Sequence, residues 1–137
     1  MIVMEQHPTK INSAENVYSI ISTLLKSREE EEQHKEYFYS IGLTSRNKVL
    51  YVDLVAMGTV NACYPFVREV LRMALIKNAV SIIVAHNHPS GTVEPSPEDK
   101  RFTRDLTSSC NTLGIRLLDH VIAGEETYYS FADSGTL

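Results

Sequence analysis

The amino-acid sequence predicts an α/β fold in which helices cover both faces of a mixed β-sheet. Three segments carry apolar residues at helical spacing, and short segments that resemble strands alternate with them. One strand segment, residues 80–85, is mostly apolar and rich in β-branched residues, which is typical of a strand buried on both faces. The order is helix, two strands, helix, buried strand, helix, strands. We therefore predict a three-layer α/β/α sandwich.

The first half of the chain is expected to supply one helix and a β-hairpin. Residues 1–12 carry no regular pattern and are expected to be irregular. Ser13 is a suitable N-cap for the first helix. The apolar stripe of that helix consists of Val17, Ile20, Ile21, Leu24 and Leu25. Residues 37–43 and 48–55 are expected to be strands, and the polar residues 44–47 suit the turn between them.

The second half is expected to add two helices and the remaining strands. A helix is expected to begin at Pro65 and to end near Asn78, with its apolar face at Phe66, Val70, Ala74 and Leu75. The next helix is expected to begin at Ser96 and to stop at Gly114. Phe102, Leu106 and Leu113 form its apolar side. The last strands are expected at residues 115–122 and 128–131.

Composition limits the classes of function. A chain of 137 residues fits a single domain over residues 1–137, and its formal charge of −4 argues against a broad surface for nucleic acid. No apolar run is long enough to span a membrane, and the first residues do not resemble a signal peptide. Cys63 and Cys110 lie too far apart in the sequence for a CxxC zinc ribbon, and two buried thiols are expected. We therefore expect a cytoplasmic protein.

The segment after the buried strand carries the candidate chemistry. Side chains two residues apart on a strand share a face, so His86 and His88 are expected to converge while Asn87 points away. Pro89 and Gly91 are expected to turn the chain out of the strand. A pair of imidazoles at this spacing favours a metal site over two unrelated polar residues.

A carboxylate follows at the start of the next helix. Ser96 suits the N-cap, Pro97 the first helical position, and Asp99 the third, where the helix dipole favours an ionised carboxylate. Ser96 and Asp99 are also explained by helix capping alone, and both roles are compatible. Two histidines and one aspartate would leave a fourth position on a tetrahedral ion for water, whose pKa zinc lowers to about 7.

These residues resemble the JAMM metalloprotease pattern of an upstream Glu, His-x-His-Pro and Ser-x-x-Asp. The string His-Asn-His-Pro-Ser-Gly, the later Leu-Asp-His-Val-Ile at 118–122 and the run at 128–133 resemble the RadC branch specifically. The likeness runs from about Ser13 to Leu137. Many RadC relatives carry an N-terminal helix-hairpin-helix domain, which this chain is too short to hold. That difference weakens a DNA-repair assignment.

The resemblance implies a cytidine-deaminase-like JAMM/MPN fold, a bound Zn²⁺ and a set of roles. His86, His88 and Asp99 would be ligands, Ser96 would help to stabilise an oxyanion, and Glu36 would be the general base. Glu36 could equally be one more acid in a polar connection. Glu69 is a rival for the base, although helical pairing with a basic neighbour explains it equally well. We expect His120 to be structural and His34 to be exposed.

Three functions follow from this pattern. The first is a zinc-dependent hydrolase of the metalloprotease type that cleaves a peptide or isopeptide-like amide. The second is a non-catalytic binding module that keeps the metal for structure. The third is a nucleic-acid enzyme, which the acidic charge disfavours. A nucleobase deaminase is less compatible, because His-x-Glu and Pro-Cys-x-x-Cys are missing from the sequence. The sequence identifies neither the substrate nor the oligomeric state.

Overall fold

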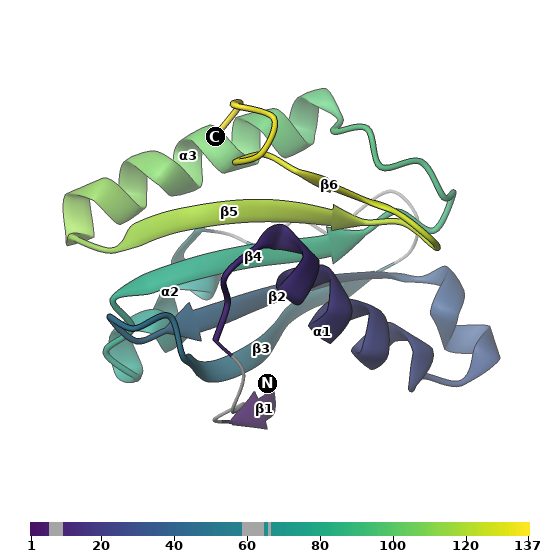
Figure 1. Ribbon diagram of the computed structural model, residues 1–137, viewed down its shortest axis with the longest axis horizontal. Helices are drawn as coiled ribbons and strands as arrows, with labels where there is room; N and C mark the ends of the chain where they lie inside the picture. The colour runs from purple at the N-terminus through teal and green to yellow at the C-terminus, as the bar shows by residue number, and fades with distance from the viewer. Residues whose placement is uncertain (6–9, 59–64, 66) are drawn as a thin grey trace.

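The computed structural model describes residues 1–5, 10–58, 65 and 67–137 (Figure 1). The described residues form three α-helices, a short 3-10 helix over Glu30–His34, and one six-stranded sheet of order β1-β3-β2-β4-β5-β6. The helices are α1 (Ala14–Lys26), α2 (Val67–Ile76) and α3 (Pro97–Leu113). The strands are β1 (Ile2–Glu5), β2 (Glu36–Leu43), β3 (Val49–Gly58), β4 (Ser81–Asn87), β5 (Arg116–Ala123) and β6 (Tyr128–Ser130).

The sheet is mixed, as the sequence predicts. Strand β4 runs parallel to β5 and antiparallel to β2, while the other paired strands are antiparallel. A parallel pair of strands needs a crossover connection, and α3 provides it by carrying the chain from the end of β4 back to the start of β5 (Figure 1). All seven residues of β4 are buried. The buried strand β4 therefore carries one candidate histidine near its end, and the other follows directly after it.

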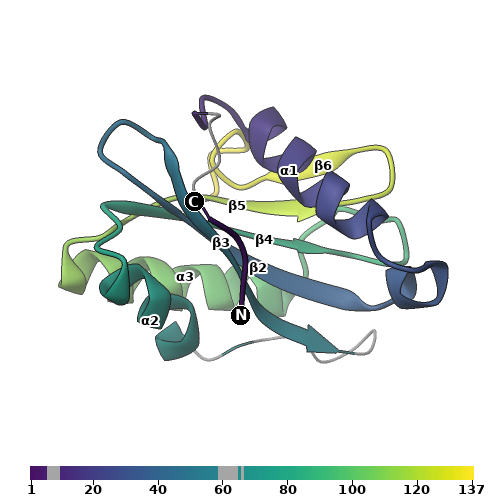
Figure 2. The ribbon, with the colours of Figure 1, turned by 90° about the horizontal axis from the view of Figure 1, so that it is seen from below.

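The helices lie on both faces of the sheet, which confirms the three-layer prediction. Figure 2 shows α1 on one side and α2 with α3 on the other. Each side has its own apolar core: Ile21 and Ile83 belong to the core under α1, and Val70, Leu106 and Ile82 belong to the core under α2 and α3. Alternate residues of β4 contribute to both cores, as expected for a strand covered on both faces.

The structure corrects several expectations. Residues 1–12 are not wholly irregular, because β1 pairs with β3 as an edge strand. Four residues are too few to show an alternating pattern. Leu75 is 53% exposed and Leu113 is 48% exposed, although both were assigned to the apolar faces of their helices. They line a groove between α2 and α3. Phe66 and Cys63 lie outside the described residues.

Two further expectations concern the cysteines and the possibility of a membrane-spanning helix. Cys110 is a buried, free cysteine on α3, as predicted. Among the residues that the structure describes, no helix has the length and apolar character needed to cross a membrane.

Candidate metal centre

The two histidines stand at the carboxyl end of β4. His86 is within the strand and 3% exposed, and His88 follows directly after Asn87, the last residue of the strand. The chain then turns: the N–H of Gly91 donates to the carbonyl of His88 at 3.0 Å, and Gly91 adopts a φ of 89°. That left-handed conformation suits glycine. The predicted turn after the strand is therefore present.

The carboxylate stands at the start of α3. Ser96 is the N-cap, and the N–H of Asp99 donates to Ser96 Oγ at 3.1 Å. The N–H of Ser96 donates in return to Asp99 Oδ2 at 2.8 Å, which completes a capping box. The capping explanation is therefore confirmed, and the cap fixes the direction of the Asp99 side chain, which leaves a ligand role compatible with it.

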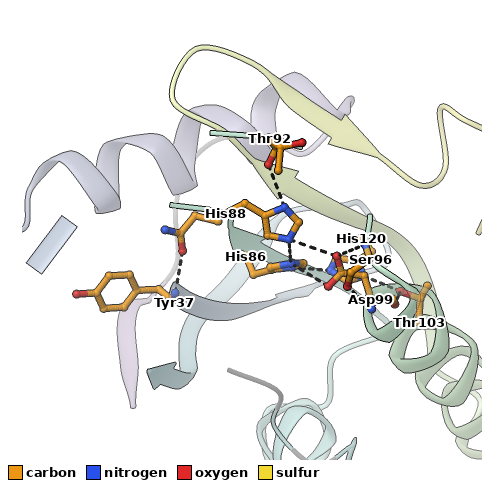
Figure 3. A network of polar contacts seen from close by, with 9 residues as sticks. Tyr37, His86, His88, Thr92, Ser96, Asp99, Thr103 and His120 are labelled. Atoms are coloured by element: carbon orange, nitrogen blue, oxygen red, sulfur yellow. Dashed lines mark hydrogen bonds and ion pairs between the residues drawn. The ribbon is translucent and has the colours of Figure 1, made fainter. Parts of the chain in front are cut away.

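The ligand atoms of three side chains converge at this point (Figure 3). His86 Nε2 lies 3.1 Å from His88 Nε2 and 3.2 Å from Asp99 Oδ1, and His88 Nε2 lies 3.3 Å from Asp99 Oδ2. Ligands at 2.0–2.1 Å from a tetrahedral zinc ion lie about 3.3–3.4 Å from one another. The spacing therefore fits a cation of this kind with little movement.

The protons in this cluster also fit a cation. His88 Nδ1 lies 3.0 Å from the carbonyl oxygen of Thr92. A carbonyl only accepts, so Nδ1 of His88 carries the proton and Nε2 of the neutral ring presents a lone pair. Asp99 Oδ1 is buried and accepts no hydrogen bond from the described residues. A buried carboxylate oxygen in that situation is costly unless a positive charge compensates it.

Burial sets the protonation of the ligands. It holds the pKa of His86 well below its ordinary range, with further lowering by the neighbouring His120 and His88, and it also lowers the pKa of His88. Both rings are therefore neutral and able to act as ligands. Burial raises the pKa of the Asp99 carboxyl and outweighs the hydrogen bond from the Ser96 N–H. Burial thus acts against the stabilisation of the ionised form expected at the helix start, and a bound cation would lower the pKa of this carboxyl again.

Glu36 lies close to this cluster. It is the first residue of β2, and the printed register pairs Phe38 with His86. Continued by two residues, that register places Glu36 across from His88, on the face that carries His86. Burial, followed by the negative charge of Asp99, raises the pKa of Glu36 to about 7. A carboxyl with this pKa is suited to exchange a proton near neutral pH.

Asn87 fixes the backbone on both sides of Glu36. Its side chain points away from the histidines, as predicted, and its Oδ1 accepts from the N–H of Tyr37 at 2.7 Å. Its Nδ2 donates to the carbonyl of Lys35 at 2.9 Å. The residue between the two histidines thus links the end of β4 to the start of β2, where the candidate base stands.

The rival residues lie elsewhere. Glu69 is exposed on α2 and lines the groove between α2 and α3, which contains none of the three ligand residues. His34 is exposed, as predicted. It borders a cavity of about 260 Å³ that reaches His88 between α1, the 3-10 helix and the β5–β6 turn. Of the three candidate ligands, only His88 lines that cavity.

His120 is the residue whose contact the sequence analysis missed. It lies inside β5, fully buried, and its Nε2 is 2.8 Å from Nδ1 of His86. Burial, followed by the effect of His88, lowers its pKa to about 3. Its place in a strand was predicted, but a pairing of β5 beside β4 is needed to bring the two rings together. The only sequence signal was a histidine in a segment that resembles the RadC branch.

Comparisons with known proteins agree with the site. A family model described as a RadC-like JAB domain matches residues 11–136. A UPF0758 protein of Vibrio vulnificus is 37% identical over 130 residues, which cover 95% of this chain and 56% of the relative. A UPF0758 protein of Methanosarcina mazei is 37% identical over 132 residues, covering 96% of this chain and 56% of the relative.

Another UPF0758 protein, from Burkholderia cenocepacia, is 42% identical over 102 residues, or 74% of this chain and 40% of that protein. The chain thus spans about half the length of the curated relatives that it matches. The match covers every element from α1 to β6, including both histidines and the start of α3. This chain belongs to the family of proteins with a RadC-like JAB domain.

Proposed function

We propose that the protein is a zinc-dependent hydrolase that cleaves peptide or isopeptide-like amide bonds. His86, His88 and Asp99 are the proposed metal ligands. The observation that carries the proposal is the convergence of two imidazole nitrogens and a buried carboxylate within 3.1–3.3 Å of one another. Nitrogen and carboxylate ligands with three protein donors are the set that catalytic zinc uses, and zinc bound there supplies a water activated for attack at neutral pH.

One side chain would transfer the proton, and another would stabilise the negative charge that develops on the substrate oxygen. Glu36 accepts the proton of the attacking water and passes it to the leaving amine, a role that its pKa of about 7 supports. Ser96 accepts a hydrogen bond from the N–H of Asp99, so its own hydroxyl proton remains able to reach a developing oxyanion.

Two broader expectations are part of this proposal. We propose that residues 1–137 form one domain, which two apolar cores on a single sheet support. A cytoplasmic location is supported by the free thiol of Cys110. An acidic protein with a formal charge of −4 gives little support to nucleic acid as the substrate.

Metal content is the first test. Purified protein is dialysed, analysed for bound metal, and titrated with zinc against a chromogenic chelator. We expect one zinc per chain, with His88→Ala strongly reducing zinc affinity, because it removes one of three protein ligands. His34→Ala is the matched control, since His34 is an exposed histidine outside the cluster. Equal zinc binding by wild type and His88→Ala would exclude the proposed site.

Turnover is the second test. The zinc-loaded protein is incubated with a complex peptide pool and an isopeptide-linked peptide in H₂¹⁸O, and mass spectrometry reports new carboxylates that carry ¹⁸O. Glu36→Gln is expected to keep zinc and to lose cleavage. Full activity of that variant would reject Glu36 as the base. Zinc binding without cleavage of either probe would favour the metal-stabilised binding module.

A further inference from the structure

His120 belongs to a chain of polar contacts that runs from the candidate centre into α3. His86 Nδ1 lies 2.8 Å from His120 Nε2, and His120 Nδ1 lies 2.6 Å from Thr103 Oγ1. The Thr103 hydroxyl also donates to the carbonyl of Asp99 at 2.7 Å. All of these groups are buried, and Figure 3 shows how they lie around the candidate centre. This series of contacts thus begins at one proposed ligand, His86, and ends at the backbone of another, Asp99.

One arrangement of protons makes all three contacts hydrogen bonds at once. A carbonyl only accepts, so the single Thr103 hydroxyl proton goes to Asp99. Thr103 Oγ1 must then accept, which places a proton on Nδ1 of His120. His120 in its neutral form accepts at Nε2, which in turn places a proton on Nδ1 of His86. The Nε2 lone pair of His86 then faces His88 and Asp99.

The His120 ring is held in place by packing. It stacks on Phe131 with ring centroids 4.8 Å apart and planes 8° apart, and it meets the edge of Phe38 at 5.9 Å. Phe38 itself stacks on His86 at 5.6 Å. Because the ring is fixed and shielded from water, its two nitrogens keep their separate partners. The reversed arrangement, with His120 Nε2 donating to His86, would place the His86 proton on Nε2.

We propose that Thr103 and His120 are positioning residues that hold the proton of His86 on Nδ1 and so present its Nε2 to the metal. The inference rests on the proposed metal site and extends it into α3 and β5. His88 has the simpler arrangement of a backbone carbonyl as its partner. Partners of this kind around a metal-binding histidine typically change metal affinity by about 10–100-fold when they are removed.

The test compares Thr103→Val with Thr103→Ser, because valine keeps the volume and serine keeps the hydroxyl. Long-range ¹H–¹⁵N NMR on EDTA-treated protein reports which nitrogen of each histidine carries the proton, and chelator competition reports zinc affinity. In the wild type we expect His86 and His120 to be protonated on Nδ1. Thr103→Val should lose that fixed pattern and bind zinc about 10–100-fold more weakly. Thr103→Ser should keep the wild-type proton pattern and bind zinc with an affinity close to that of the wild type.

Thr107→Val is the matched control. Thr107 lies one turn further along α3, and its hydroxyl donates to the carbonyl of Thr103 at 2.7 Å. The Thr107→Val variant therefore loses the same kind of hydrogen bond to the helix backbone, but no contact with a histidine. Its zinc affinity should equal that of the wild type. If Thr103→Val does not fold, His120→Phe and His120→Gln replace it, since both fill the site and glutamine keeps an acceptor. Phenylalanine should weaken zinc binding and glutamine should restore much of it.

Two results would overturn the proposal. One is a wild-type His86 protonated on Nε2, and the other is a folded Thr103→Val or His120→Phe variant with wild-type zinc affinity. Failure of the metal site is distinguishable from failure of these positioning roles. A wild type that binds no zinc rejects the proposed function, while the proton positions in EDTA still decide the arrangement around His120.

Discussion

Replacing Glu36 by glutamine is expected to make the fold more stable at pH 8, although the residue is proposed to be essential for turnover. The pKa of Glu36 rises from 4.5 to about 7 on folding, because burial and the charge of Asp99 disfavour its ionised form. Below pH 4.5 both the folded and the unfolded chain bind the proton, so the shift costs no stability. As pH rises from 4.5 through 7, the unfolded chain releases its proton first and stability is lost.

The size of the effect follows from this change in pKa. A rise from 4.5 to about 7 corresponds to about 3 kcal/mol at about 1.4 kcal/mol per pH unit. Glu36 is partly exposed, and solvent screening reduces that figure to roughly 1–2 kcal/mol. Glutamine has the same shape and no charge, so it avoids this cost at every pH.

Urea unfolding in EDTA at pH 5 and pH 8 measures the difference. The chelator is required because a bound cation would stabilise the Glu36 carboxylate. We expect Glu36→Gln to exceed the wild type by roughly 1–2 kcal/mol at pH 8, with a smaller gain at pH 5. Glu69→Gln removes the same charge from an exposed position on α2 and should change stability by less than about 0.5 kcal/mol. A gain for Glu36→Gln that is absent, or independent of pH, would refute the reasoning.

Two further substitutions test the site, and a third, at Gly124, tests the turn between β5 and β6. Asn87→Ala removes both hydrogen bonds to the backbone around Glu36 and should cost about 1–3 kcal/mol in urea unfolding, with zinc affinity nearly unchanged in a chelator titration. Asp99→Asn removes a buried charge, so in EDTA its melting temperature should equal or exceed that of the wild type while zinc binding is lost; retained zinc would argue against Asp99 as a ligand. Gly124→Ala places a Cβ 2.7 Å from Val93 Cγ1 and should destabilise the fold by about 1–3 kcal/mol, as measured by thermal unfolding. An unchanged melting temperature would show that the segment around Val93 moves aside without cost.

Local rules account for much of what the sequence predicted. The N-cap at Ser13 and the capping box at Ser96 depend on residues three positions apart, so the starts of α1 and α3 are readable from the chain itself. Gly114 ends α3 with a φ of 74°, as glycine readily does. Alternation along β4 predicted that His86 and His88 share a face and that Asn87 points away.

Long-range pairing decided the rest. Residues 2–5 form strand β1 because their backbone pairs with the edge of β3, a strand distant in sequence. No pattern in residues 1–12 signals this pairing. Leu75 fits a helical stripe but stays exposed in the groove between α2 and α3, whereas Leu71, one turn earlier, is buried.

The candidate centre divides in the same way. The sequence by itself predicted which three side chains converge, because His86, His88 and Asp99 are placed by a strand end and a helix cap that are both local. Only the tertiary structure decided their surroundings. The parallel pairing of β4 with β5 brings His120 to His86, and the antiparallel pairing of β4 with β2 brings Asn87 to the backbone beside Glu36. The physical reason is that burial and hydrogen-bond partners, which set protonation, come from strands distant in sequence.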